Sequence, residues 1–216
     1  MSSFSHVFAS DGNIQIKVNP AKKAKIAVYL RIPGWVRNQP VPGNLYSYLK
    51  TGNETITIKV NGQPATYKTE EGYAVIDRDW KKGDVIEYNL PMNIHRVIAN
   101  TKVEADVNKV TIERGPIVYC LEGIDNGITL GNMILPDDAE LTATFVPGKL
   151  QGIEQITGEA VVFEPTADGL SITTTKRQIT AIPYCVWDNR GADQMKVWIP
   201  RKITNITVAE TPASTN

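Results

Sequence analysis

Short runs of alternating apolar and polar residues constrain the fold of this chain more than any other feature. Residues 13–18, for example, place Ile14, Ile16 and Val18 opposite Gln15 and Lys17. A period of two is typical of a β-strand with one buried face. Similar strand-like runs, separated by turn signals, occupy residues 25–32, 55–60, 72–76, 85–90, 107–112, 116–121, 141–145, 160–163, 170–175, 179–187 and 195–199.

The spacing of these runs predicts the architecture. Strands every ~8–12 residues with turns between them favour antiparallel sandwiches over βαβ units. No segment keeps a helical period over ten or more residues. We therefore predict an all-β protein of two consecutive, largely antiparallel β-sandwich domains. The expected order is a first sandwich at 1–122, a linker at 123–138, a second sandwich at 139–209 and a disordered tail at 210–216.

Charge and hydropathy exclude several classes of partner. Lys+Arg 23 balances Asp+Glu 23, so no basic field exists to attract nucleic acid or anionic lipid. No apolar run approaches the ~20 residues of a membrane span. The first six residues lack the features of a secretory signal, and the compartment stays open, with a periplasmic or secreted parent protein as one alternative.

Two cysteines, Cys120 and Cys185, each follow a tyrosine within an apolar run. Two are too few for the disulfide framework of a small secreted domain. Unpaired cysteine is among the most buried residue types. We therefore expect both to be buried free thiols.

Three motifs carry a family resemblance: LRIPGW at residues 30–35, IERGPIVYCLE at 112–122 and IPYCVWDNRG at 182–191. Together they resemble the non-catalytic β-sandwich tail of glycoside hydrolase family 127, the β-L-arabinofuranosidase group. The part up to Glu122 resembles the family's middle β domain, and the later part resembles its C-terminal β domain.

The resemblance implies a supporting role. In that family the chemistry sits on a helical barrel with a zinc-bound cysteine nucleophile, and the motifs of that barrel are not found in this sequence. The implied partners are the helical-barrel catalytic domain of a parent glycoside hydrolase and a second copy in a homodimer. Two alternatives stay open: a carbohydrate-binding module for arabinan-type glycans, and an independent hydrolase.

The sequence offers no catalytic or metal-binding constellation of its own. His6, His95 and the two cysteines lack metal-ligand spacing, so we predict no metal and no cofactor. Most acidic pairs lie in turns, where solvated surface charge is the ordinary outcome. Glu113 and Glu122 flank one strand, and we expect structural ion pairing with Arg114 or Arg96.

Binding residues are predicted in the first sandwich. Trp35, just past a strand end, and Tyr46 and Tyr48, on a long loop, are the aromatic side chains expected to be exposed and to bind carbohydrate. Trp187 and Trp198 are expected in the core, as aromatic side chains commonly are. Trp35, His95 and Arg96 follow strand ends, and we expect them to form the docking surface for the missing barrel.

Overall fold

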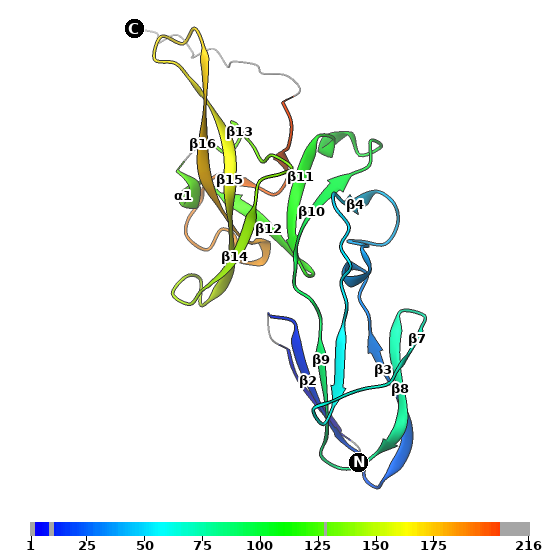
Figure 1. The fold of residues 1–216 in the computed structure, drawn as a ribbon. Helices are drawn as coiled ribbons and strands as arrows, with labels where there is room; N and C mark the ends of the chain where they lie inside the picture. The colour runs from blue at the N-terminus through cyan, green and yellow to red at the C-terminus, as the bar shows by residue number, and fades with distance from the viewer. Residues whose placement is uncertain (1–2, 9–10, 128, 204–216) are drawn as a thin grey trace. The chain divides into compact units, whose positions relative to one another are not determined.

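A computed structural model describes residues 3–8, 11–127 and 129–203 and confirms the predicted all-β fold (Figure 1). Among these residues the only α-helix is α1 (Gly123–Asn126). No described helix has the length and apolar character needed to cross a membrane. The tail expected at 210–216 lies outside the described residues.

The chain folds as two units, and the division differs from the predicted one. The first unit holds the described residues up to His95 together with Arg114–Pro116. The second holds Arg96–Glu113 and the described residues from Ile117 onward. The chain thus passes into the second unit near His95, well before the boundary expected at Glu122.

The first unit contains two antiparallel sheets. Five strands in the order β1-β2-β9-β5-β6 form one sheet, and three in the order β3-β8-β7 form the other. Their bounds are β1 Ser3–Phe8, β2 Asn13–Asn19, β3 Ala24–Arg31, β5 Thr57–Val60, β6 Gln63–Pro64, β7 Lys68–Glu70, β8 Tyr73–Trp80 and β9 Asp84–Asn89. Strand β4 (Tyr46–Tyr48) lies in the long segment between β3 and β5.

Alternation fixes which face of each sheet is buried. Ile86 on β9 lies opposite Ile16 on β2, and Ile86 is fully buried. Ile76 and Trp80 on β8 are buried in the same way. The buried Tyr88 hydroxyl donates to the carbonyl of Arg31 at 2.7 Å and so links the two sheets. Burial raises the pKa of Tyr88 to about 12, which keeps the hydroxyl protonated as a donor.

The second unit is built on one large antiparallel sheet, in which the order β13-β15-β16-β12-β11-β10 forms the main path. Strand β14 pairs with β15, β17 with β12, and β18 with β11. Their bounds are β10 Ile94–Ala99, β11 Lys109–Arg114, β12 Ile117–Glu122, β13 Met133–Ile134, β14 Leu141–Val146, β15 Ile153–Pro165, β16 Ile172–Pro183, β17 Met195–Lys196 and β18 Ile199–Pro200.

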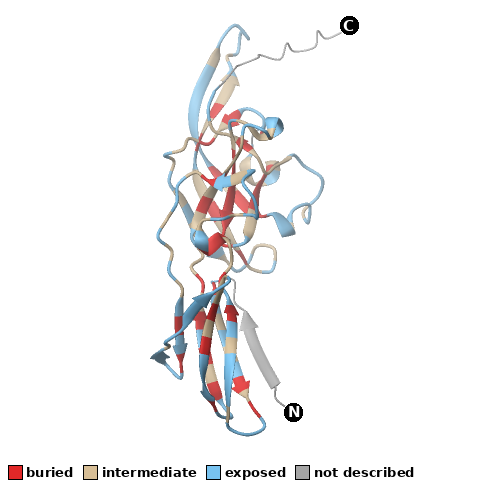
Figure 2. Cartoon of the chain, turned by 90° about the vertical axis from the view of Figure 1, so that its right-hand side faces the viewer, coloured by how far each residue is buried: buried red, intermediate tan, exposed pale blue. Residues whose placement is uncertain are grey.

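The segment predicted as a linker, residues 123–138, belongs to the core of the second unit. Leu130, Met133 and Leu135 are each at most 2% exposed, and β13 pairs with β15. In the sequence, these apolar residues lie among glycine, asparagine and aspartate residues. No strand-like period therefore indicated that all three are buried. Figure 2 shows buried residues along the strands of both units.

Candidate functional site

The predicted sugar-binding rings do not present free faces. Trp35 is 9% exposed and Tyr48 is 5% exposed, while Tyr46 is half-buried. Gly34 accepts hydrogen bonds from the backbone of Arg37 and Gln39, at 2.7 and 2.9 Å, and this tight turn carries Trp35 inward. The expectation that Trp35 and Tyr48 are exposed is therefore wrong.

Tyr48 instead belongs to a buried polar cluster with His95 and Glu54. The rings of Tyr48 and His95 are stacked, with centroids 4.2 Å apart. His95 Nε2 lies 2.6 Å from Glu54 Oε1, and Asn93 donates to the same oxygen at 2.9 Å. Glu54 was not a sequence candidate, and nothing in its local sequence distinguishes it.

The predicted docking group is not assembled as one exposed surface. Trp35 and His95 are buried within the first unit. Arg96 belongs to the second unit, where its guanidinium donates to the carbonyl of Ala139. Burial lowers the pKa of Arg96, and Asp137 and Asp138 oppose that effect. A docking surface that needs Trp35 exposed is thus not retained.

In the second unit, a charged network connects two of the sequence motifs. Arg190 from the IPYCVWDNRG motif donates to both Asp125 oxygens, at 2.7 and 2.6 Å, and to Glu122 from the IERGPIVYCLE motif. Lys149 adds a second cation, 2.6 Å from Asp125. Glu122 therefore pairs with Arg190, which corrects the expected pairing with Arg114 or Arg96. Arg190 is 65 positions from Asp125 and 68 from Glu122, so no local pattern could predict these pairs.

The charges of this network hold parts of the second unit together. We call the network of Glu122, Asp125, Lys149 and Arg190 the clamp. Burial by itself would raise the pKa of Asp125, but hydrogen bonds from Arg190 and Lys149 outweigh that effect and lower it. Glu122 also accepts the backbone N–H of Asp188 at 2.8 Å. Both carboxylates are thus occupied in holding the loop after β16 to the end of β12.

In the loop after β16, two residues that were expected to be buried are exposed. Trp187, predicted in the core, is 37% exposed, and Cys185, predicted buried, is also exposed. The apolar run at residues 179–187 continues past the end of β16 into a short helical turn at Tyr184–Val186. In this turn the side chains no longer alternate between two faces, as they would in a strand. Of its three residues, only Val186 packs inward.

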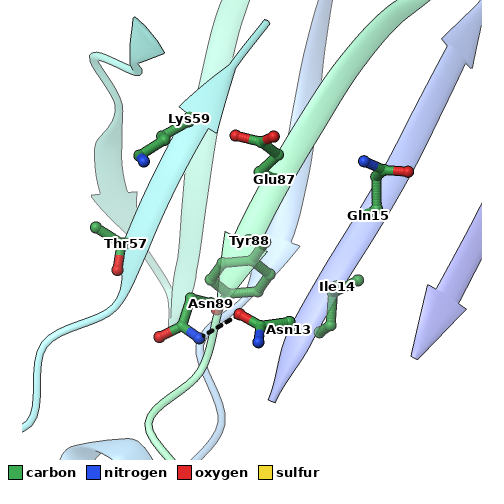
Figure 3. Close-up of a pocket in the computed structure, with 8 residues that line it drawn as sticks. All are labelled: Asn13, Ile14, Gln15, Thr57, Lys59, Glu87, Tyr88 and Asn89. Atoms are coloured by element: carbon green, nitrogen blue, oxygen red, sulfur yellow. Dashed lines mark hydrogen bonds between the residues drawn. The ribbon is translucent and has the colours of Figure 1, made fainter. Parts of the chain in front are cut away.

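A hollow of about 620 Å³ lies on the polar face of the five-stranded sheet (Figure 3). Gln15, Glu87 and Lys59 form one row across β2, β9 and β5. Asn13, Asn89 and Thr57 form the next row, and Asn89 donates to Asn13 at 2.7 Å. Ile14 and Tyr88 complete the lining.

The hollow does not have the groups that glycoside hydrolysis requires. That reaction usually takes two carboxyl groups ~5–10 Å apart. Glu87 is the single carboxylate among the lining residues. Across the described part of the chain, no three His, Cys, Asp or Glu residues gather closely enough to hold a metal ion.

Family models match almost the whole chain. The model of the β-L-arabinofuranosidase GH127 middle domain matches residues 4–92. The model of the glycoside hydrolase family 127 C-terminal domain matches residues 94–200. The two matches meet close to the structural division after His95.

Individual relatives agree with the family models. A non-reducing end β-L-arabinofuranosidase from Bifidobacterium longum subsp. longum is 30% identical over 209 residues, which cover 88% of this chain and 29% of the relative. A solved GH127 β-arabinofuranosidase superposes with a TM-score of 0.88 at 37% identity, covering 94% of this chain and 32% of that chain. A GH127 β-L-arabinofuranosidase from Geobacillus stearothermophilus T6 gives a TM-score of 0.78 at 34% identity, covering 92% and 30%. The chain thus spans less than a third of the length of each.

Proposed function

Because the chain belongs to glycoside hydrolase family 127, we propose that it is the non-catalytic accessory region of a glycoside hydrolase of the β-L-arabinofuranosidase group. In this proposal its two β units support a helical-barrel catalytic domain and help that enzyme to dimerise. The observation that carries the proposal is the pattern of coverage: middle and C-terminal family domains follow one another, over only 29–32% of each relative's length.

The polar groups of the chain support the same proposal. In the second unit, Glu122 and Asp125 are both bound to Arg190, and Asp125 is also bound to Lys149. In the first unit, Glu54 is bound to His95. Carboxylates committed to such pairs hold structure together and are poorly placed to transfer protons to a substrate.

The supporting role is tested on the native protein. An antibody raised against this chain is used to capture the protein from its source cells, and the captured material is sequenced by mass spectrometry. We expect a family 127 helical barrel in the same polypeptide or in a stable complex with it. Sedimentation of the captured protein measures the dimer. A free 216-residue chain with no barrel attached would contradict the proposal.

A further inference from the structure

Two aromatic side chains lie exposed and close together on the loop after β16. Tyr184 is 42% exposed and Trp187 is 37% exposed. Their ring centroids are 6.2 Å apart and their planes differ by only 15°. Val186, between them in sequence, packs the other way, against the buried cluster of Cys120, Ile153 and Ile182. The two rings therefore form a small aromatic surface on the outer side of this loop.

The loop is held in place before any ligand arrives. Glu122 accepts the N–H of Asp188 at 2.8 Å, and Arg190 is bound by Glu122 and Asp125. Asn189 donates from its side chain to the carbonyl of Val186 at 2.9 Å. A ligand that binds the rings thus avoids most of the cost of ordering the loop.

The polar neighbours indicate which ligand fits. Asp188, Asn189 and Asp193 are exposed in the same loop, while the charge of Arg190 is neutralised by its two carboxylates. The loop that carries the rings is therefore rich in exposed hydrogen-bonding groups, and Asp188 and Asp193 add negative charge to it. The C–H face of a neutral sugar can pack on an aromatic ring while its hydroxyl groups bond to polar side chains. An acidic sugar would be repelled by Asp188 and Asp193.

The size of the surface favours a sugar over a protein. At these exposures the two rings offer roughly 150–200 Å² together, given the area that aromatic side chains of this kind can bury. A stable protein interface needs about 800 Å² from each partner. One or two sugar rings match the smaller area.

We propose that Tyr184 and Trp187 form a binding platform for neutral oligosaccharides. The choice of arabinose-containing probes rests on the proposed function, whereas the platform itself rests on the exposed rings and the anchored loop. The platform would hold a glycan chain on the second unit, with no part in bond cleavage.

The experiment titrates the chain with linear arabino-oligosaccharides and, in parallel, with oligogalacturonides as acidic probes. Binding is followed by tryptophan fluorescence and by calorimetry. We expect saturable binding of the neutral probe, with a Kd on the order of 1 mM, and weaker binding of the acidic probe. Trp187→Ala and Tyr184→Ala should each weaken binding by about 10-fold. Tyr29→Ala is the control, because it removes a ring that is 56% exposed on β3 of the first unit, and it should leave the Kd unchanged.

Circular dichroism of each variant confirms that the fold is kept. Absence of saturable binding at tens of millimolar probe would overturn the platform, as would equal binding by Trp187→Ala. Association with a helical barrel that is lost in Trp187→Ala, without sugar binding, would assign the rings to a protein interface instead. These outcomes leave the supporting role to be decided by the capture experiment, so the two proposals can fail separately.

Discussion

Gly115, between β11 and β12, has a backbone φ of +56°, in the left-handed region that favours glycine. A Cβ at this position would overlap the Met92 sulfur and lie 2.7 Å from its methyl group. We predict that Gly115→Ala lowers the free energy of unfolding by about 1–3 kcal/mol, through backbone strain and displacement of Met92. Chemical denaturation measures the loss.

Gly62 provides the matched control, because its φ of +77° is also left-handed but no described atom lies within 4 Å of an added Cβ. Gly62→Ala should therefore show the backbone cost alone, about 1 kcal/mol, which is the penalty of a left-handed conformation for a residue with a Cβ. In the background of Met92→Ala, the penalty of Gly115→Ala should fall toward that value. Equal penalties for the two glycines in the parent protein would show that Met92 does not matter.

The two cysteines should differ in reactivity. Burial, with Glu122 as a second cause, raises the pKa of Cys120 to about 12, so its reactive thiolate is scarce and enclosed. Cys185 is exposed. Titration with a thiol reagent should count one thiol in the native protein and two after denaturation, and none natively in Cys185→Ser. Rapid native reaction of both thiols would contradict the structure.

At the scale of elements, the clamp between β12, α1 and the loop after β16 should contribute measurably to stability. Arg190→Met leaves the carboxylates of Glu122 and Asp125 buried without their main partner. We predict a loss of about 2–4 kcal/mol in the free energy of unfolding at neutral pH. Arg177→Met is the control, because the Arg177–Glu164 pair is exposed and should contribute at most about 0.5 kcal/mol. Equal losses in the two variants would refute the clamp.

The clamp also has a defined pH dependence. The folded-state pKa of Asp125 is lowered, so its stabilising contribution is present above the unfolded value of about 3.9 and is lost as the pH falls through the folded pKa. In Arg190→Met, Asp125 keeps only Lys149 and Glu122 loses its cation, so burial opposes their charges more strongly and protonation relieves both carboxylates. The difference in stability between parent and variant should therefore shrink between about pH 5 and about pH 3. A constant difference over this range would argue against ion pairing as its source.

Individual strands could be predicted where one face is buried and the other solvated. Strand β2, with Ile14 and Ile16 alternating against polar residues, is found at Asn13–Asn19, close to the predicted 13–18. Strand β16 was predicted only in pieces, because residues 173–178 are exposed on both faces and carry no alternation. The site was harder still. Contacts such as Glu54 with His95, 41 positions apart, depend on tertiary packing that no local period encodes.

At the scale of the whole molecule, both units are β structures in which buried carboxylates such as Glu54 and Glu122 bind side chains from distant parts of the sequence. The motifs at residues 112–122 and 182–191 identified the family correctly, yet they did not locate the boundary between units. The first motif itself crosses that boundary, since Arg114–Pro116 belong to the first unit and Ile117 onward to the second. Because residues of one motif are divided between two units, the motif looks in the sequence like the end of a single domain.

The central proposal, that this chain is a non-catalytic region of a glycoside hydrolase, is tested most directly by measuring turnover of an aryl β-L-arabinofuranoside by the purified chain. A complete family 127 β-L-arabinofuranosidase serves as the positive control under the same conditions. We predict no turnover above the uncatalysed rate, because the chain places neither a free nucleophile nor a paired acid and base in its polar hollow. Turnover that disappears when Glu87, Glu54 or Glu122 is replaced by glutamine would contradict the account.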